Sequence, residues 1–322
     1  MVDFALDCDV ITLENEFIDA DVLRRVRNAS GKPMYPTPET FDLIGDKRSE
    51  KETFEKAGIA VTPWAVIANI EEARKFGEIH GYPFVVKSSK GGYDGYGNET
   101  VHTADEAEKA WGSLGGYARR EIIAEAFVDF RMELAVQVAR NQTGIVVYPC
   151  CESIQEGHIC KTVIAPARIS ESLRHKTEEL AVAAVEAIDG IGLFAFEFFL
   201  THDDRILLNE SAPRPHNSGH YTIEGCITSQ FENHVRAVLG LPLGSTRMRR
   251  NAAVMVNLLG KRNHPAIAEQ TATLFHTEDA HLHIYGKKAS KVGRKMGHVT
   301  VLGDDVETTL NRATWLADHI ML

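Results

Sequence analysis

A chain of 322 residues is long enough for two or three domains, and its net charge of −10 argues against a general nucleic-acid binder. The 44% hydrophobic and 25% charged content is that of an ordinary globular protein, and no apolar run approaches the roughly 18 residues of a membrane span. The five cysteines form no CxxC pair, and acidic residues stand where a signal peptide would be basic. We therefore expect a cytoplasmic protein with no membrane partner, disulfide framework or zinc ribbon.

The chain opens with the pattern of one strand and one helix. Residues 9–13 have the composition of a strand, and residues 18–26 have the spacing of a helix that faces a core. Glycine and prolines between residues 31 and 38 then mark a loop. A parallel-sheet unit needs a further strand–helix pair before this one, so we expect residues 1–45 to be the remnant of an α/β domain.

Helices and strands then mix without strict alternation. Helical patterns cover residues 39–57, 70–80, 105–114, 173–188, 230–239 and 306–319. Strand patterns cover residues 84–88, 99–102, 121–125, 131–139, 143–148, 158–164, 193–200, 205–210, 254–258, 281–285 and 297–302. This mixture predicts α+β subdomains built around antiparallel sheets.

The stretch KGGYDGYG directly follows a short apolar strand pattern. Its glycines tolerate positive φ, its successive backbone N–H groups can bind an anion, and Lys87 and Lys90 add positive charge. A loop that closes over a polyphosphate and a simple hairpin turn are both compatible with these residues. The spacing is neither that of a Walker A loop nor that of a dinucleotide fingerprint.

Strand alternation places Glu197 on the same face as Ala195 and Phe199 in the run FAFEFF. A carboxylate amid aromatic side chains needs a partner. The next strand ends in Asn209 and Glu210, and carboxylates on adjacent strands suit one or two Mg²⁺ ions that bridge phosphates. A buried salt bridge to an arginine is the alternative for either glutamate.

Three further segments carry polar groups that could form a site. The run RPHNSGH, which begins at Arg214, is dense in donors and is either a binding loop or a polar turn. Five cations within residues 287–295 form either a solvated loop or a phosphate pocket. Glu125–Val128 with Glu133 is either a nucleotide-binding edge or an ordinary strand. No GxSxG or HExxH motif occurs, which argues against common hydrolases.

In chain order, the segments KSSKGGYDGYGN, EAFVDFRME, FEFFL, LLNESAPRPHNSGHYTIEGCITSQFENHVRAVLGLPLG and YGKKASKVGRKMGH closely resemble one family, the 5-(carboxyamino)imidazole ribonucleotide synthetases of purine biosynthesis. The resemblance covers about residues 9–315, and residues 209–244 are its most specific part. It implies an ATP-grasp fold of mixed α+β and α/β class. The truncated α/β domain would be followed by an ATP-grasp domain at 46–250, with a lid at 70–126, and by a small β-rich domain at 251–322.

The resemblance implies ATP-dependent carboxylation of aminoimidazole ribonucleotide by bicarbonate through carboxyphosphate, with Mg²⁺ as cofactor and a homodimer as the assembly. The products would be 5-(carboxyamino)imidazole ribonucleotide, ADP and phosphate. One alternative is another ATP-grasp ligase, such as formate-dependent glycinamide ribonucleotide transformylase, although the segments TIEGC and GRKMGH favour the synthetase. The other alternative is an ATP-binding subunit without catalytic activity.

The resemblance also implies a role for each matching residue. ATP would be held by Lys47, Lys87, Gly92, Tyr93, Asp94, Gly95, Tyr96, Gly97, Asn98, Glu125, Ala126, Phe127, Val128, Glu133, Gln155, Asn209 and Glu210. Mg²⁺ would be bound by Glu197 and Glu210. Bicarbonate or carboxyphosphate would meet Arg214, His216 and Asn217, and Asp94 is the candidate base. The ribonucleotide would contact Glu14, Glu16, Tyr93, Asp94, Lys287 and Arg294.

Three departures from the family pattern carry expectations of their own. Tyr96 stands where the family usually has Arg or Lys, so the loop lacks a cation that Lys90 could replace. Gln155 stands where the family often has His. The family also has a strand and a GGGQLG loop before the position of Asp3. Since that loop helps to bind the substrate phosphate, we expect nucleotide binding to survive its loss better than turnover does.

Overall fold

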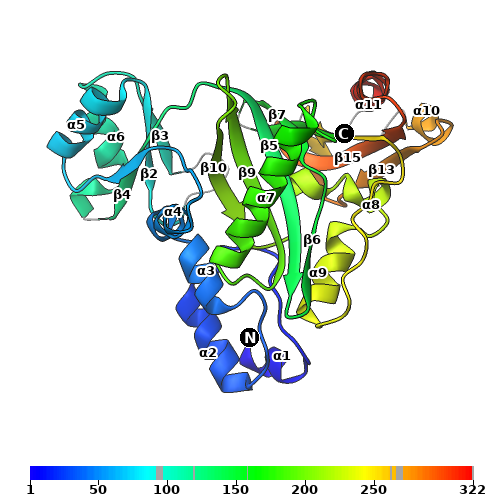
Figure 1. Cartoon of the computed structure of the whole chain (residues 1–322), viewed down its shortest axis with the longest axis horizontal. Coiled ribbons are helices and arrows are strands. Elements are labelled where there is room, and N and C mark those ends of the chain that lie inside the picture. Colours follow the sequence, from blue (N-terminus) through cyan, green and yellow to red (C-terminus); the bar gives the residue numbers. More distant parts are fainter. Residues whose placement is uncertain (92–96, 119, 158, 262, 266–270, 321–322) are drawn as a thin grey trace. The chain divides into compact units, whose positions relative to one another are not determined.

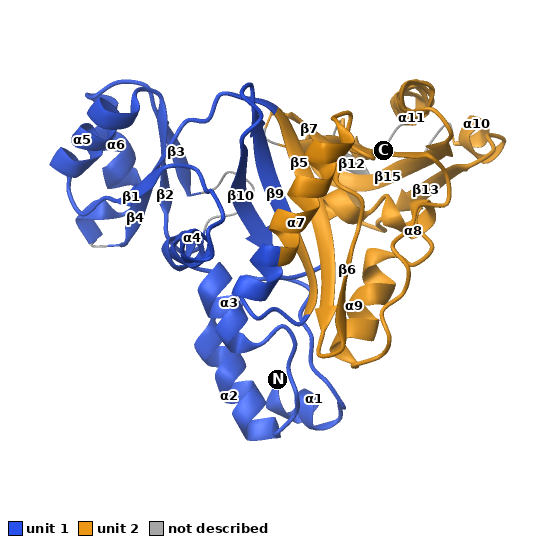
Figure 2. Cartoon of the chain, viewed as in Figure 1, with its two compact units in different colours: residues 1–131, 183–191, 196–214 blue, residues 132–182, 192–195, 215–322 orange. Residues whose placement is uncertain are grey.

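The computed structural model describes residues 1–322 except 92–96, 119, 158, 262, 266–270 and 321–322 (Figure 1). The chain divides into two compact units, which Figure 2 colours separately. Unit 1 comprises residues 1–131, 183–191 and 196–214, and unit 2 comprises residues 132–182, 192–195 and 215–322. The helix α7 (Glu171–Ala187) and the strands β5 (Phe130–Asn141) and β9 (Gly192–Thr201) are each divided between the units.

Unit 1 begins with α1 (Val2–Leu6) and α2 (Ala20–Ser30), which pack with α3 (Pro38–Ile44) around a small apolar core. The sequence pattern did not predict α1. The expected strand at residues 9–13 is wrong, because the segment makes only one isolated bridge, from Ile11 to Met34. Prolines flank Met34 closely in the partner segment, and proline has no N–H to extend a ladder.

The helix expected at residues 39–57 is two helices, α3 and α4 (Lys47–Lys56), with Gly45 and Asp46 between them. The side chain of Asp46 accepts hydrogen bonds from the backbone N–H groups of Arg48 and Ser49. An aspartate in this position begins a new helix because it satisfies donors that have no partner in the first turn.

A four-stranded sheet in unit 1 has the order β1-β4-β2-β3 and antiparallel pairing. Its strands are β1 (Trp64–Val66), β4 (Ile122–Ala126), β2 (Phe84–Ser88) and β3 (Asn98–Val101). The helices α5 (Ile70–His80) and α6 (Glu106–Ser113) bury Phe76 and Trp111 in one core with Phe84. A 3₁₀ turn, η1 (Gly116–Ala118), follows α6.

The last part of unit 1 combines β9 with its neighbour β10 (Ile206–Ala212). The connecting turn holds Asp204 at φ 61°, and the ring of Phe199 stacks on that of Phe130 at 4.5 Å between centroids. The backbone N–H of Leu208 donates to the carbonyl of Ala60 at 2.8 Å. This bond ties β10 to the segment that follows α4.

Unit 2 is built on antiparallel strands in the order β5-β7-β8-β11-β15-β13, with β6 beside β5. They are β5 (Phe130–Asn141), β6 (Gly144–Val147), β7 (Cys151–Glu156), β8 (Ile159–Ala165), β11 (Ala252–Leu259), β13 (Ala280–Ile284) and β15 (Lys295–Gly303). The sequence pattern missed β7. These strands confirm the prediction of antiparallel sheets.

Helix α11 (Val306–His319) packs against β11 and β15, where Val254, Val299 and Leu316 share one core. A second core contains Met255 and Tyr221, beside η2 (Asn217–Gly219) and α8 (Thr222–Gly225). The remaining elements of unit 2 are α9 (Gln230–Val238), α10 (Ala272–Phe275), β12 (His264–Pro265) and β14 (Ala289–Ser290). Over the described residues, no helix is both long enough and apolar enough to cross a membrane.

Candidate active site

Helix α4 presents one charged face within unit 1. Glu50 and Lys51 lie three and four residues after Lys47, and Phe54 lies four and three residues after them, so the four share a side of the helix. Phe54 is buried and meets Phe196 edge-on at 6.3 Å between ring centroids. Beside this anchor Glu50 and Lys51 are buried, at 4% and 2% exposed, and Lys47 is partly exposed.

Glu125 on β4 is the centre of this charged cluster. Its Oε2 lies 2.8 Å from Nζ of Lys87 on β2, and its Oε1 lies 3.3 Å from Nζ of Lys51. Val85 is directly opposite Glu125, so Lys87, two residues on, is its diagonal neighbour on the same face. Burial raises the pKa of Glu125, but the Lys87 and Lys51 charges outweigh burial and hold it at about 2.

Lys47 and Glu210 extend the cluster. Burial lowers the pKa of Lys47, but the carboxylates of Glu210, Glu50 and Glu125 more than compensate and raise it above its ordinary value. The neighbouring carboxylates therefore favour the charged form of Lys47. Glu50 accepts hydrogen bonds from the backbone N–H and the hydroxyl of Ser211, next to Glu210. This contact fixes the end of β10 against α4.

Arg214 and Glu16, both predicted to contact substrates, form an ion pair in unit 1. Nη2 of Arg214 donates to Oε1 of Glu16 at 2.7 Å, and Nε donates to the other carboxylate oxygen. Burial lowers the pKa of Arg214, and its bonds and charge contacts with Glu16, then Glu14 and Glu210, raise it overall. The bidentate pair fixes the plane of the guanidinium group.

Glu197 and Glu210 lie on the neighbouring strands β9 and β10, and Asn209 adjoins Glu210. Among the described residues, no group of three or more His, Cys, Asp or Glu side chains is placed to hold a metal ion. This donor set nevertheless fits Mg²⁺, which proteins commonly bind through one or two carboxylates while phosphate and water oxygens complete the shell.

In unit 2, Gln230 holds the loop that contains His216. The side-chain Oε1 of Gln230 accepts from the backbone N–H of His216 at 3.0 Å, and its Nε2 donates to the carbonyl of the same residue at 2.8 Å. Gln230 is fully buried, and its backbone N–H donates to the hydroxyl of Thr222. A Cβ atom on Gly219 would come within 2.3 Å of Gln230 Oε1, so only glycine allows this close contact.

Asn217 makes a reciprocal amide pair with Asn257 of β11. Nδ2 of Asn217 donates to Asn257 at 3.0 Å, and Nδ2 of Asn257 donates back at 2.7 Å. The same Nδ2 of Asn257 also donates to the carbonyl of Cys160 at 2.9 Å. A carbonyl can only accept, so it fixes which end of Asn257 carries the donors, and the pair then fixes the amide of Asn217.

A row of aromatic and imidazole side chains continues across the sheet from Asn257. His298 is opposite both Asn257 on β11 and His283 on β13. The imidazoles of His298 and His283 stack at 4.4 Å, and the hydroxyl of Tyr285 lies 2.9 Å from Nδ1 of His298. A hydrogen bond to Glu224 raises the pKa of His283, while burial lowers that of His298 to about 2.

The predicted phosphate-binding cations Lys287 and Arg294 lie in the connection between β13 and β15. Nζ of Lys287 donates to the carbonyl of Lys295 at 2.7 Å, and Arg294 donates to the carbonyl of Ala289 at 3.2 Å. Burial, followed by the charges of Arg294 and Lys295, lowers the pKa of Lys287. The cations are therefore close enough for their charges to repel, which an anion would relieve.

Glu133 and Gln155, two predicted nucleotide contacts, are brought together in unit 2. Glu133 is opposite Ser153 in the register of β5 and β7, and Gln155 Nε2 donates to the hydroxyl of Ser153 at 3.2 Å.

The remaining predicted nucleotide contacts are near the sheet of unit 1 or outside the described residues. Gly97 has φ 82° and its carbonyl accepts from Ser88, and Asn98 is opposite Lys87 at the start of β3. Ala126 ends β4, Phe127 is 56% exposed, and Val128 follows it. The predictions for Gly92, Tyr93, Asp94, Gly95 and Tyr96 fall on residues that the structure does not describe.

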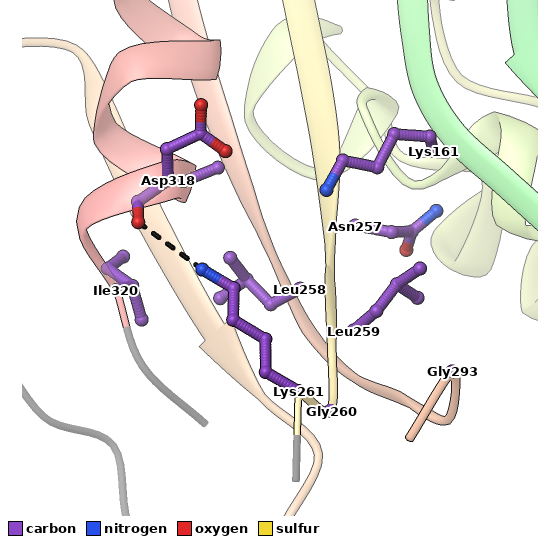
Figure 3. A pocket seen from close by; sticks show the side chains of 10 residues that line it. Lys161, Asn257, Leu258, Leu259, Gly260, Lys261, Gly293, Asp318 and Ile320 are labelled. Carbon is purple, nitrogen blue, oxygen red and sulfur yellow. Dashed lines mark hydrogen bonds between the residues drawn. The ribbon is translucent and has the colours of Figure 1, made fainter. Parts of the chain in front are cut away.

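A small pocket of unit 2 lies beside Asn257. It encloses about 180 Å³, and its lining includes Lys161, Asn257, Lys261, Gly293 and Asp318. Figure 3 shows these side chains, with Nζ of Lys261 donating to the backbone carbonyl of Asp318. A pocket for a drug-sized ligand is typically about 300–1,000 Å³, so this volume is too small for a nucleotide.

Several site residues were not predicted from the sequence. They are Glu50, Lys51, Gln230 and Asn257, together with Gln137 and Ser218, which are joined by a hydrogen bond of 2.9 Å from Nε2 of Gln137 to the hydroxyl oxygen of Ser218. Glu50 and Lys51 could have been predicted from their spacing to Phe54 on one helix. Residues that share a helix face with a buried aromatic side chain also face the interior. No local signal indicated Gln137 or Asn257, since each looks like an ordinary residue within a strand.

Two protein families match the chain. The ATP-grasp domain matches residues 52–231. The phosphoribosylaminoimidazole carboxylase C-terminal domain matches residues 253–312. Together the two matches include most of the segments described above.

Solved structures of similar proteins cover nearly all of the chain. The N5-carboxyaminoimidazole ribonucleotide synthetase from Thermotoga maritima is 40% identical, with a TM-score of 0.87 over 99% of this chain and 83% of that one. The N5-carboxyaminoimidazole synthase from Aspergillus clavatus, in complex with ADP and 5-aminoimidazole ribonucleotide, is 37% identical, with a TM-score of 0.86 over 98% and 83%.

A longer protein is also similar. The phosphoribosylaminoimidazole carboxylase of Schizosaccharomyces pombe is 39% identical in an alignment that covers 99% of this chain. The chain spans 58% of the length of that relative.

Proposed function

Because this chain belongs to the N5-carboxyaminoimidazole ribonucleotide synthetase family of ATP-grasp proteins, we propose that it joins bicarbonate to the amine of aminoimidazole ribonucleotide at the expense of ATP. The products are N5-carboxyaminoimidazole ribonucleotide, ADP and phosphate. The observation that carries the proposal is the charged cluster of unit 1, in which Glu125 lies 2.8 Å from Lys87 and 3.3 Å from Lys51, and in which the carboxylates of Glu210, Glu50 and Glu125 outweigh burial and raise the pKa of Lys47. A cation and a carboxylate in this arrangement suit a nucleotide polyphosphate and its metal ion.

Lys47 and Lys87 neutralise the phosphates of ATP in this proposal. Lys87 forms an ion pair with Glu125 at 2.8 Å, and the charge of Glu125 contributes to the raised pKa of Lys47. Glu197 and Glu210 hold Mg²⁺, which when bound supplies further positive charge against the phosphate oxygens. Glu125–Val128, Glu133 and Gln155 are the proposed contacts to the nucleoside.

Arg214, His216 and Asn217 bind the bicarbonate and the carboxyphosphate derived from it. All three are donors whose orientation is fixed by other side chains: Glu16 for Arg214, Gln230 for the backbone of His216, and Asn257 for Asn217. The attack of one anion on another requires such fixed donors, because they stabilise the developing charge without reorganising. Asp94 is the proposed base that takes the proton of the amine.

Lys287 and Arg294 bind the phosphate of the ribonucleotide, and Glu14, Glu16 and Tyr93 contact the rest of that substrate. The mutual repulsion of the two cations favours a site for an anion. The substrate preference also separates this proposal from that of a formate-using ligase, which would take glycinamide ribonucleotide instead.

A phosphate-release assay tests the proposal. The purified chain is supplied with ATP, Mg²⁺ and bicarbonate, with and without aminoimidazole ribonucleotide, and in parallel with formate and glycinamide ribonucleotide. We expect release that depends on the imidazole ribonucleotide, together with formation of the carboxylated product. A folded chain that binds ATP and releases no phosphate under any of these conditions would contradict the proposal and support a non-catalytic subunit.

We also propose that the protein is a cytosolic homodimer with domains at residues 1–45, 46–250 and 251–322. None of the five cysteines, all of which lie in the described part of the chain, forms a disulfide bond, which is typical of a reducing compartment, and the two family matches support the boundary near residue 251. Light scattering after size-exclusion chromatography would measure the mass of the assembly.

A further inference from the structure

Ser218 and Gln137 are two buried polar residues beside His216 that have no role in the proposed reaction. Nδ1 of His216 accepts from the backbone N–H of Ser218 at 3.4 Å and lies 2.8 Å from the hydroxyl oxygen of the same serine. A backbone N–H can only donate, so Nδ1 must be the acceptor. The ring proton of the neutral imidazole therefore belongs on Nε2.

A second donor, on the neighbouring strand β5, supports the assignment of the ring proton of His216 to Nε2. Nε2 of Gln137, on β5, donates to the hydroxyl oxygen of Ser218 at 2.9 Å. With this donor on one side, the serine directs its own hydrogen towards Nδ1 of His216. Gln137 is fully buried and Ser218 is 1% exposed, so water does not compete for either bond.

The backbone is also held tightly at this point. A Cβ atom on Gly219 would lie 2.9 Å from Cγ of Gln137, which shows how closely the loop approaches β5. The side chain of Gln230 also accepts a hydrogen bond from the backbone N–H of His216 and donates one to its carbonyl. The ring of His216 is thus fixed through both its backbone and its Nδ1 atom.

We infer that Gln137 and Ser218 are positioning residues that hold His216 as the Nε2–H tautomer, so that it donates a hydrogen bond to the bicarbonate or carboxyphosphate anion. This inference rests on the proposed function for the identity of the anion, and it assigns His216 the role of a donor, not of a base at Nε2. The chain of donors runs in one direction, from the amide of Gln137 through the serine hydroxyl to the imidazole. If the donor at position 137 is replaced by an acceptor, the direction of the hydrogen bond between Ser218 and His216 should also reverse.

Gln137→Glu makes that reversal. The carboxylate can only accept, so the hydroxyl of Ser218 turns towards it, and the serine oxygen, 2.8 Å from Nδ1 of His216, becomes an acceptor for a proton there, against which only the longer 3.4 Å bond from the backbone N–H of Ser218 acts. Ser218→Ala removes the link altogether and leaves a smaller side chain, which is easy to accommodate. Thr300→Val is the matched control, because Thr300 is a fully buried residue of the same unit whose hydroxyl has no hydrogen-bond partner among the described residues.

Two measurements on the full chain test the inference. Nitrogen-15 NMR of selectively labelled histidine reports the tautomer, and the His216 signal is assigned by its loss in His216→Ala. Steady-state phosphate release with bicarbonate and aminoimidazole ribonucleotide reports kcat and the KM for ATP. We expect Nε2–H for His216 in the wild type and in Thr300→Val, and a shift towards Nδ1–H in Gln137→Glu.

Both variants of the donor chain should lower kcat by about 10- to 100-fold, the usual effect of losing the partner that orients a functional imidazole. The KM for ATP should stay within about twofold. Unchanged tautomer and kcat in both folded variants would overturn the inference. A wild-type chain without substrate-dependent turnover would overturn the proposed function instead, because the NMR measurement does not depend on turnover.

Discussion

Glu125→Gln separates the charge of the buried cluster from its shape. Glutamine has nearly the same size as glutamate, so the variant removes the negative charge between Lys87 and Lys51 and little else. The side chain of Lys51 is only 3% exposed, and Glu125 is its one ion-pair partner among the described residues. The variant therefore leaves a buried ammonium group without a counter-charge, and such a loss costs about 3–5 kcal/mol.

The pKa of Glu125 gives an independent estimate. Its value falls from 4.5 to about 2 in the folded protein, and each pH unit corresponds to about 1.4 kcal/mol, so the folded environment stabilises the ionised carboxylate by about 3 kcal/mol. Because the folded pKa is the lower one, this stabilisation is complete above about pH 4.5. It is lost as the pH falls from about 4.5 towards about 2.

Denaturant unfolding of the wild type and of Glu125→Gln at a series of pH values measures the effect. We expect a difference in unfolding free energy of about 3 kcal/mol at pH 7 that shrinks steadily below about pH 4.5. The double variant Glu125→Gln with Lys51→Met should recover most of the loss, because it also removes the uncompensated charge. A difference that is small at pH 7, or that does not change with pH, would refute the reasoning.

Three further predictions concern ligands. Lys47→Met should raise the KM for ATP by about tenfold or more, because a charged donor typically contributes about 1.5–3 kcal/mol, whereas Lys56→Met, at a side chain 79% exposed, should leave the KM unchanged. Asn257→Leu should lower kcat about tenfold with little change in the KM for ATP, since Asn217 loses the amide that orients it, and an unchanged kcat would contradict that role. Glu210→Gln should raise the Mg²⁺ concentration for half-maximal activity by about tenfold in a Mg²⁺ titration, and chelation of the metal should abolish turnover of the wild type.

The secondary structure was predicted best where the local sequence alone indicates a helix. The helix at residues 70–80 and the one at residues 306–319 were placed correctly, because each has a capping side chain and a regular apolar face. The strand β7 was missed because its sequence, CESIQE, has no β-branched alternation beyond one isoleucine. It is a strand because β5 and β8 flank it, which no local pattern reveals.

The sequence predicted the charged residues of the candidate site but not the side chains that fix their orientation. Lys87, Glu125 and Arg214 could be named from motifs, since phosphate and carboxylate chemistry needs those residue types. That Lys87 pairs with Glu125, or Arg214 with Glu16, depends on strand register and chain packing over long sequence separations. Buried partners such as Asn257 carry no sequence signal because an amide in a strand is compatible with many environments.

These partners explain how a chain with net charge −10 can present cations to an anion. Burial disfavours the charged form of a lysine, and it lowers the pKa of Lys51 even though Glu125 lies 3.3 Å away. Lys47 keeps its proton because Glu210, Glu50 and Glu125 surround it with negative charge. The acidic residues of unit 1 are therefore part of the proposed anion site, and removing a carboxylate such as Glu125 should weaken ATP binding even though it removes negative charge. A variant that bound ATP more tightly after that loss would show that repulsion between the carboxylates and the phosphates is the larger effect.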